Sequence, residues 1–283
     1  MKLKFIPSDY EYFVLNGKTY MKIFGKTSEG KTCCLIDETV NFFYVLNAEP
    51  EKLIKKIKDI EGVKRVELVS KNYLGKPVKV IKVFCEYHEM QGIAHKIKGI
   101  DKGVETRERD INQITRYITE KKIKPLVWYE IQGSPFAERV EADFVIKLEK
   151  AWELEKQPDF KPKVLAFDIE TEQFEIGRGK ILMLSLVSDN FRKVLTWKKT
   201  NKAKKYVEFC KDEKEMLEKF MQYTNKINPD IITGYFSDGF DFPYIRARAE
   251  KHGLDLRLGM TKSRIVFSKG RPLNAKIIGL VHV

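Results

Sequence analysis

Apolar and polar residues alternate along the first part of the chain in short stretches that are typical of β-strands. Between residues 10 and 46 these stretches are YFVL, KTYMKIF, KTCCLI and NFFYVL. Asn16-Gly17 separates the first two, and this dipeptide is the strongest short signal for a two-residue hairpin turn. We therefore expect the chain to begin with several strands joined by tight turns.

The spacing of apolar residues changes repeatedly between helical and strand periodicity across residues 40–110. EPEKLIKKIKDI carries its apolar residues at helical spacing, and the strand-like stretches VKRVELV and VKVIKVFCEY follow it. EMQGIAHKIKGI is a second expected helix, and VETRERD is a further expected strand. The order strand, helix, strand, strand, helix, strand is the split βαβ pattern of ferredoxin-like folds, an architecture that serves many functions.

A second pattern begins at Val164, after a third expected helix (INQITRYITEKK) and a polar connection with two prolines (EKQPDFKPK). The expected strands here are VLAFDIET, ILMLSLV, KVLTW and PDIITGY, and the expected helices are EKEMLEKFMQYTNKI and FPYIRARAEKHG. Several strands precede any helix, so this part predicts a mixed sheet flanked by helices. The closing segment KIIGLVHV is again strand-like and contains no stop signal.

Composition and charge narrow the class of protein. The 283 residues are 43% hydrophobic, which is ample for two packed cores and excludes a disordered chain. No apolar run approaches the roughly 18 residues that cross a bilayer, so we expect a soluble, cytoplasmic protein without a membrane partner. The formal charge of +13 favours a polyanionic partner such as nucleic acid. An acidic membrane or a lysine-rich, heat-adapted surface would explain the same charge.

The cysteines and histidines do not indicate a metal site. The four cysteines have no CxxC spacing, and we interpret them as reduced core residues (Cys33, Cys34, Cys85 and Cys210). The four histidines have no H-x3-H spacing, and lone histidines are usually surface or core residues.

Two acids on one strand are the first candidate for chemistry. The continuous apolar run in VLAFDIET predicts a buried strand, and a period of two places Asp168 and Glu170 on the same face. Neighbouring carboxylates repel each other unless they are protonated or bridged by a cation, and hard oxygen ligands suit Mg²⁺ or Mn²⁺. The alternative is a strand end with two solvated acids.

Asp241 is the second candidate, and it stands just ahead of an expected helix with Pro243 in its first turn. A structural explanation is available, because Asp before a helix that begins with proline is a preferred N-cap. However, the preceding strand PDIITGY could bring Asp241 to the carboxyl edge of the sheet that contains Asp168.

These residues resemble a known family. FDIET and NPDIITGYFSDGFDFPYI resemble the first and second exonuclease motifs of archaeal family B DNA polymerases, and YLGKP resembles a stretch of their N-terminal domains. The resemblance implies an N-terminal domain over residues 1–130 with a ferredoxin-like unit. A ribonuclease-H-like 3′→5′ exonuclease domain would follow over residues 131–283, giving a chain of mixed α+β and α/β class.

The resemblance also implies a chemistry. Asp168, Glu170 and Asp241 would help to hold two divalent ions, Mg²⁺ or Mn²⁺, with Asp168 bridging both. One ion would activate water, and the other would stabilise the leaving 3′ oxygen. The implied partners are single-stranded DNA and primer-template DNA, with the protein associated with the nucleoid. The alternative is a module that binds single-stranded template without catalysis.

The sequence departs from the family pattern at the exonuclease site. The family usually has Asn where this chain has Phe236. The third exonuclease motif, a Tyr with an Asp four residues later, is expected beyond Val283. The palm, fingers and thumb are also outside these residues, so we expect a fragment or one product of a split polymerase, with the remaining polymerase domains on a separate chain. We expect no nucleotide incorporation by this chain.

The sequence also departs from the family pattern at a pocket of the N-terminal domain. Archaeal members have a template pocket there that captures uracil, and Tyr12 and Arg116 stand where pocket residues are expected. A tight base pocket needs rigid apolar walls. Asn41, Asn112 and Gln113 replace the prolines and the aromatic residue of the family, which argues against uracil capture.

Overall fold

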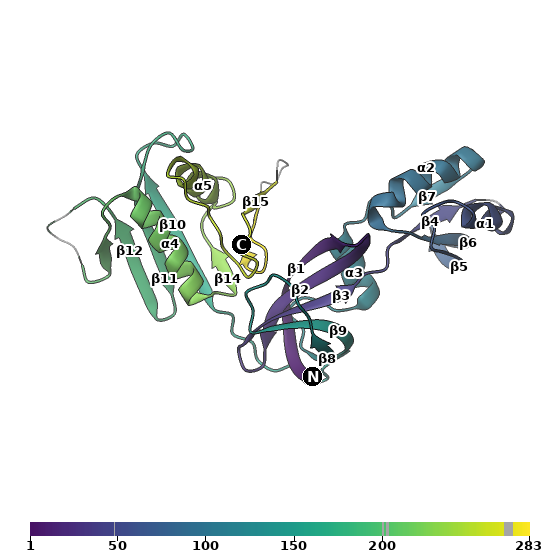
Figure 1. Cartoon of the computed structure of the whole chain (residues 1–283), viewed down its shortest axis with the longest axis horizontal. Helices are drawn as coiled ribbons and strands as arrows, with labels where there is room; N and C mark the ends of the chain where they lie inside the picture. Colours follow the sequence, from purple (N-terminus) through teal and green to yellow (C-terminus); the bar gives the residue numbers. More distant parts are fainter. Residues whose placement is uncertain (48, 200, 202–203, 269–273) are drawn as a thin grey trace. The chain divides into compact units, whose positions relative to one another are not determined.

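The computed structural model describes residues 1–47, 49–199, 201, 204–268 and 274–283, which form two compact units (Figure 1). Unit 1 contains Met1–Tyr10, Ile23–Leu35 and Pro125–Val283, and unit 2 contains Glu11–Lys22 and Ile36–Lys124. The chain therefore passes between the units several times, whereas the sequence pattern predicts one division near residue 130. The assignment of domains on either side of residue 130 remains a prediction.

Five strands close into a barrel in the order β1-β2-β3-β9-β8. Their bounds are β1 (Lys2–Leu15), β2 (Lys18–Thr27), β3 (Thr32–Glu38), β8 (Tyr129–Pro135) and β9 (Phe144–Glu153). Asn16 and Gly17 have φ angles of 50° and 76°, as expected for the predicted hairpin turn. The sequence pattern did not predict β8 and β9. β8 pairs with the neighbouring β9 and also with β1, where Lys2 lies opposite Gln132, and this second pairing is long-range and leaves no local signal.

Unit 2 contains a four-stranded antiparallel sheet in the order β5-β6-β4-β7. Along the chain the elements are β4 (Phe42–Leu46), α1 (Pro50–Lys58), β5 (Arg65–Tyr73), β6 (Lys76–Phe84), the short 3₁₀ helix η1 (Tyr87–Glu89), α2 (Met90–Ile100), β7 (Glu105–Arg107) and α3 (Gln113–Lys121). The predicted order of strands and helices is confirmed. Buried residues of α1 and α2 pack against the sheet, for example Ile57 and Ile93 against Val45 and Ile81.

Unit 1 contains a six-stranded mixed sheet in the order β13-β12-β11-β10-β14-β17. Its strands are β10 (Val164–Thr171), β11 (Ile181–Ser188), β12 (Phe191–Thr196), β13 (Val207–Phe209), β14 (Ile231–Thr233) and β17 (Val281–His282). β10 is antiparallel to β11 and parallel to β14, and β14 is parallel to β17. The predicted mixed sheet is therefore confirmed.

Two helices, α4 (Glu213–Ile227) and α5 (Asp241–Lys251), pack against this sheet (Figure 1). Their Phe220 and Phe242 join Leu165 and Phe167 of β10 in one core. On β10 every second residue is buried, and the alternate positions, including Asp168, are exposed. The prediction of a buried strand is thus correct for one face and wrong for the face that carries Asp168, because α4 and α5 pack against the other face.

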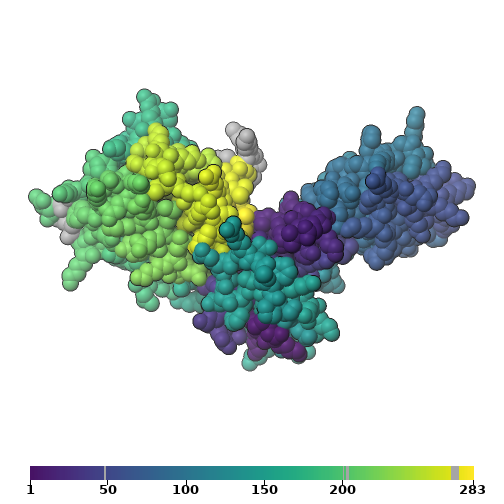
Figure 2. Space-filling view, viewed as in Figure 1, coloured from purple at the N-terminus to yellow at the C-terminus, as the bar shows by residue number. Residues whose placement is uncertain are grey.

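The C-terminal segment is less regular than its sequence suggests. β15 (Val266–Phe267) and β16 (Ala275–Lys276) form a short hairpin. The prediction of one strand over KIIGLVHV is wrong, because Gly279 turns the chain with a φ of 77° and only Val281–His282 join the sheet. Part of the segment is visible on the face of unit 1 in Figure 2 (yellow), and Val281–His282 pair with β14.

All four cysteines are buried, as expected for core residues. Among the described helices, none is long and apolar enough to cross a membrane.

Candidate active site

Asp168 and Glu170 lie on the open face of β10, near its carboxyl end. Because side chains alternate along a strand, the intervening Ile169 is buried in the core while both acids are exposed. The prediction that the two acids share one face is confirmed.

The polypeptide reaches Asp241 through β14 and the turn formed by residues 234–240. β14 runs parallel to β10, with Val164 opposite Ile231, so the carboxyl ends of both strands meet at one edge of the sheet. Gly234 allows the turn to start close to β10, since a Cβ atom there would lie 2.9 Å from the carbonyl oxygen of Phe167. The prediction that β14 brings Asp241 to this edge is confirmed by the contacts of its carboxylate.

The carboxylate of Asp241 is directed at β10 and does not cap α5. Asp241 is the first residue of α5, and the N-cap position belongs to Phe240, which makes no side-chain cap. The backbone N–H of Ile169 donates a hydrogen bond to the Asp241 carboxylate, and the charge of Asp168 acts on it. The N-cap explanation is therefore wrong, while Pro243 does lie in the first turn of the helix.

Burial and a neighbouring negative charge make Asp241 hard to ionise. Its exposed fraction is 3%, and burial, followed by the charge of Asp168, raises its pKa from 3.8 to about 6. Within the described residues, no cation pairs with Asp168 or Asp241. Two adjacent carboxylates without a counterion form an oxygen donor set that suits a hard divalent cation.

Glu170 is not part of a preformed cluster. Among the described residues, no group of three or more His, Cys, Asp or Glu side chains is arranged to hold a metal ion. The structure therefore brings Asp168 and Asp241 together but does not gather all three predicted acids at one point.

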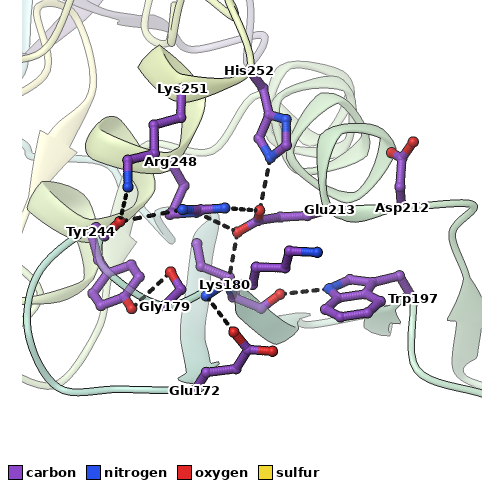
Figure 3. A network of polar contacts seen from close by, with 12 residues as sticks. Glu172, Gly179, Lys180, Trp197, Asp212, Glu213, Tyr244, Arg248, Lys251 and His252 are labelled. Atoms are coloured by element: carbon purple, nitrogen blue, oxygen red, sulfur yellow. Dashed lines mark hydrogen bonds and ion pairs between the residues drawn. The ribbon is translucent and has the colours of Figure 1, made fainter.

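A buried polar network fixes the segment that follows Glu170, residues 172–180 (Figure 3). At its centre is Glu213, which is 2% exposed and accepts hydrogen bonds from Arg248 Nε (2.8 Å) and Nη2 (2.5 Å) and from the backbone N–H of Ile181 (2.8 Å). His252 Nε2 lies 2.7 Å from the same carboxylate. Burial alone would raise the pKa of Glu213, but the hydrogen bonds from Arg248 and His252 lower it.

Helix α5, which carries Arg248, also contacts the backbone of residues 172–180 directly. Lys251 Nζ donates to the carbonyl oxygen of Gly177 (2.7 Å), and the Tyr244 hydroxyl donates to the carbonyl oxygen of Gly179 (3.0 Å). Sequence reasoning did not single out this network. The spacing of four residues between Arg248 and His252 was the available signal, because it places both side chains on one helix face.

Exposed aromatic rings lie on the two segments that follow β10 and β14. Phe174 and Tyr235 are more than nine-tenths exposed, and Phe236 is 67% exposed. The ring of Phe174 lies 6.4 Å from that of Phe240. Phe236 has a left-handed backbone with a φ of 53°, and its ring fills the space beside Gly239.

The two residues predicted for a base pocket, Tyr12 and Arg116, do not line one cavity. Arg116 is buried and lines a cavity of about 290 Å³ in unit 2, together with Asn41 and Gln113. Tyr12 is not among the described residues around that cavity, and its ring packs edge-on against Tyr87 at 5.9 Å.

Polar groups without partners form part of the wall of this cavity. Both amide atoms of Asn41, Nε2 of Gln113 and Nε of Arg116 are buried without a hydrogen-bond partner among the described residues. Burial lowers the pKa of Arg116. The rigid apolar wall that a tight base pocket requires is thus replaced by amide groups at Asn41 and Gln113.

Comparison with known proteins gives one family. The family model for the exonuclease domain of DNA polymerase family B matches residues 104–276. DNA polymerase 1 of Pyrococcus abyssi is 30% identical over 97% of this chain and 33% of its own length. The DNA polymerase of Thermococcus kodakarensis is 28% identical over 97% of this chain and 15% of its own length. The chain thus spans a third or less of these relatives.

A solved structure has the same fold. The family B DNA polymerase from the hyperthermophilic archaeon Pyrobaculum calidifontis superposes with a TM-score of 0.82 at 23% sequence identity. The match covers 99% of this chain and 36% of that polymerase.

Proposed function

The chain belongs to the family B DNA polymerases, matched over their exonuclease domain, and we propose that Asp168 and Asp241 form the core of its 3′→5′ exonuclease site. The observation that carries this proposal is the pair of adjacent carboxylates at one edge of a sheet, one of them buried with a raised pKa. Perturbed carboxylates of this kind gather at catalytic sites, because burial and like charges tune them for metal binding or proton transfer. We propose Glu170, which lies on the same face of β10 as Asp168, as the third acid of the site.

We propose the two domains that the resemblance to family B DNA polymerases implies. Residues 1–130 would form an N-terminal domain with a ferredoxin-like unit, which the sheet order β5-β6-β4-β7 supports. Residues 131–283 would form the exonuclease domain with a ribonuclease-H-like sheet, which the order β11-β10-β14 supports.

The residues present fit a hard divalent cation, Mg²⁺ or Mn²⁺. Asp168 and Asp241 supply oxygen donors, and a bound cation would favour the ionised form of Asp241, whose pKa is raised by burial and then by the charge of Asp168. When bound, the pair of ions in the complete site would activate water and neutralise the leaving 3′ oxygen. The Ile169 N–H holds Asp241 against β10, so this ligand is positioned by the protein in advance.

The surroundings of the carboxylates support single-stranded DNA as the substrate. Exposed aromatic rings stack on bases of any sequence, and Phe174 and Tyr235 offer such rings on the segments that follow β10 and β14. We further propose that the chain works on primer-template DNA with the remaining polymerase domains, in association with the nucleoid. This part of the proposal is supported by family membership alone.

Manganese-dependent shortening of a 3′-labelled single strand tests the exonuclease proposal. We expect weak trimming, because Glu170 is not gathered with the other two acids, and we expect Asp168→Ala to abolish it. Loss of one such electrostatic contact typically costs about 10²–10³ in rate. Asp159→Ala, which removes an exposed acid, is the matched control. Trimming that Asp168→Ala leaves unchanged would contradict the site.

The second candidate is a module that binds single-stranded DNA without cutting it. The positive charge and the exposed aromatic rings support this binding module as well as they support the exonuclease. Its signature is DNA binding that Asp168→Ala does not alter, together with no shortening of the strand at any manganese concentration.

A further inference from the structure

His282 contacts the turn before Asp241 with both of its ring nitrogens. It lies on β17, beside Ile232 of β14, and its side chain is 4% exposed. Nε2 lies 2.7 Å from Oγ of Ser237, and Nδ1 lies 2.9 Å from the carbonyl oxygen of Ala275. Ser237 is buried and stands in the turn of residues 234–240 that leads into α5.

The hydrogen bonds of this group assign the role of each atom. A carbonyl oxygen only accepts, so Nδ1 carries a proton and donates to Ala275. The Ser237 hydroxyl has one proton and two neighbours that accept it, namely Nε2 of His282 and the carbonyl oxygen of Gly234 at 3.1 Å. With the proton directed at Nε2, the Ser237 hydroxyl is held by His282, and its oxygen stays 3.1 Å from the carbonyl oxygen of Gly234, the first residue of the turn.

Further contacts close the turn around the imidazole. Oδ1 of Asp238 accepts the backbone N–H of Ala275 (2.5 Å) and lies 3.2 Å from Nδ1 of His282. The ring of Phe242, the residue after Asp241, meets the imidazole edge-on at 4.7 Å. The backbone N–H of Phe242 also donates to the carbonyl oxygen of Ser237 (3.0 Å). Asp238 before Asp241 and Phe242 after it are therefore tied to His282 or to its partner Ser237.

We propose that His282 is a positioning residue for Asp241: through Ser237 it fixes the turn of residues 234–240 and so keeps the Asp241 carboxylate beside Asp168. The inference rests on the proposed function in one respect, namely that this pair of carboxylates holds a divalent ion. His282 touches neither carboxylate, so its effect passes through the Ser237 contact.

Two substitutions of His282 separate its two contacts. In His282→Gln the side-chain amide reaches the position of Nε2, and its oxygen can still accept the proton of the Ser237 hydroxyl. In His282→Asn the amide takes the position of Nδ1, so the Ala275 contact is kept and the Ser237 contact is lost. Ser237→Ala removes the contact between His282 and Ser237 by changing Ser237 instead. It therefore tests the positioning role even if a His282 variant does not fold.

The position of Asp241 has a direct probe in the full chain. The Ile169 N–H is hydrogen-bonded to the Asp241 carboxylate, so its hydrogen exchange, followed by NMR without metal, reports whether Asp241 stays in place. We expect exchange of the Ile169 amide to be about tenfold faster in His282→Asn and in Ser237→Ala. The reason is that a displaced Asp241 no longer protects this amide by a hydrogen bond. His282→Gln should exchange at the wild-type rate. The amide of Leu184 in the neighbouring strand serves as the internal control and should be unchanged.

Manganese binding, measured by calorimetry, is the second readout. We expect the affinity for Mn²⁺ to fall about tenfold in the same two variants and to be kept in His282→Gln. Unchanged Ile169 exchange in both His282→Asn and Ser237→Ala would overturn the inference, as would a His282→Gln variant that behaves like His282→Asn. If Ile169 responds as expected but the wild-type chain binds no Mn²⁺, the positioning role stands and the metal site of the proposed function fails.

Discussion

At the scale of single residues, ionised Asp241 destabilises the folded protein. Burial and the charge of Asp168 raise its folded-state pKa to about 6, above the usual 3.8. Below about pH 4 Asp241 is protonated in both the folded and the unfolded chain, so it does not lower the free energy of unfolding. Between pH 4 and 6 the unfolded chain releases its proton first, and the free energy of unfolding falls as the pH rises.

Asp241→Asn should therefore stabilise the protein in a pH-dependent way. Without metal, we expect the free energy of unfolding to increase by on the order of 3 kcal/mol at pH 7.5, at about 1.4 kcal/mol for each pKa unit. At pH 4 the difference should nearly vanish. Urea unfolding at both pH values in EDTA measures it, and Asp159→Asn, at an exposed acid, controls for the loss of a charge. An equal gain at both pH values would show that the raised pKa of Asp241 is not the cause.

Phe236 carries a conformational cost of its own. A left-handed backbone costs most residues about 1–2 kcal/mol, whereas Asn tolerates it because its short polar side chain bonds locally. Phe236→Asn should therefore raise the free energy of unfolding by about 1 kcal/mol. Thermal unfolding measures the change. Tyr235→Asn, at an exposed neighbour without positive φ, should show no gain, and a gain of equal size there would refute the backbone explanation.

At the scale of elements, α4 and α5 are joined by charge as well as by apolar packing. Glu213 is the first residue of α4, and Arg248 and His252 lie at the end of α5 (Figure 3). Their contacts, with those of Tyr244 and Lys251, hold residues 172–180 just after β10. The ends of two helices and one loop are therefore expected to loosen together.

Glu213→Ala should be strongly destabilising. It leaves the buried guanidinium of Arg248 without its partner, and breaking a buried ion pair from one side costs about 3–5 kcal/mol. Glu175→Ala breaks the exposed ion pair with Arg178 in the same loop and should cost less than about 1 kcal/mol. Urea unfolding compares the two. Similar losses in both variants would contradict a special role for the Glu213 network.

At the scale of the whole molecule, the charge of +13 predicts binding to single-stranded DNA that depends steeply on salt. Lysine and arginine that contact phosphates release condensed counterions, so affinity falls as salt rises. We expect the binding constant to fall by roughly tenfold or more between 50 and 200 mM salt. Fluorescence anisotropy with a labelled oligonucleotide measures it. Binding that is independent of salt, or absent at low salt, would remove the nucleic-acid role.

The elements and candidate acids were largely predictable because their signals are local. Helix α4 begins and ends at the predicted residues, since its periodic apolar positions lie within one segment. Asn16-Gly17 specifies a hairpin by its own backbone preferences. A strand period of two is enough to place Asp168 and Glu170 on one face.

Which partners those residues meet was decided only by tertiary structure. Whether Asp241 caps a helix or faces Asp168 depends on the parallel pairing of β14 with β10, which joins residues that lie 67 positions apart, as with Val164 and Ile231. The open face of β10 depends on where the helices pack. Ser237 and His282 meet across 45 positions, and no local pattern records such a contact. Local sequence fixes backbone preference and side-chain periodicity, whereas the potential at a carboxylate is set by whatever the fold brings beside it.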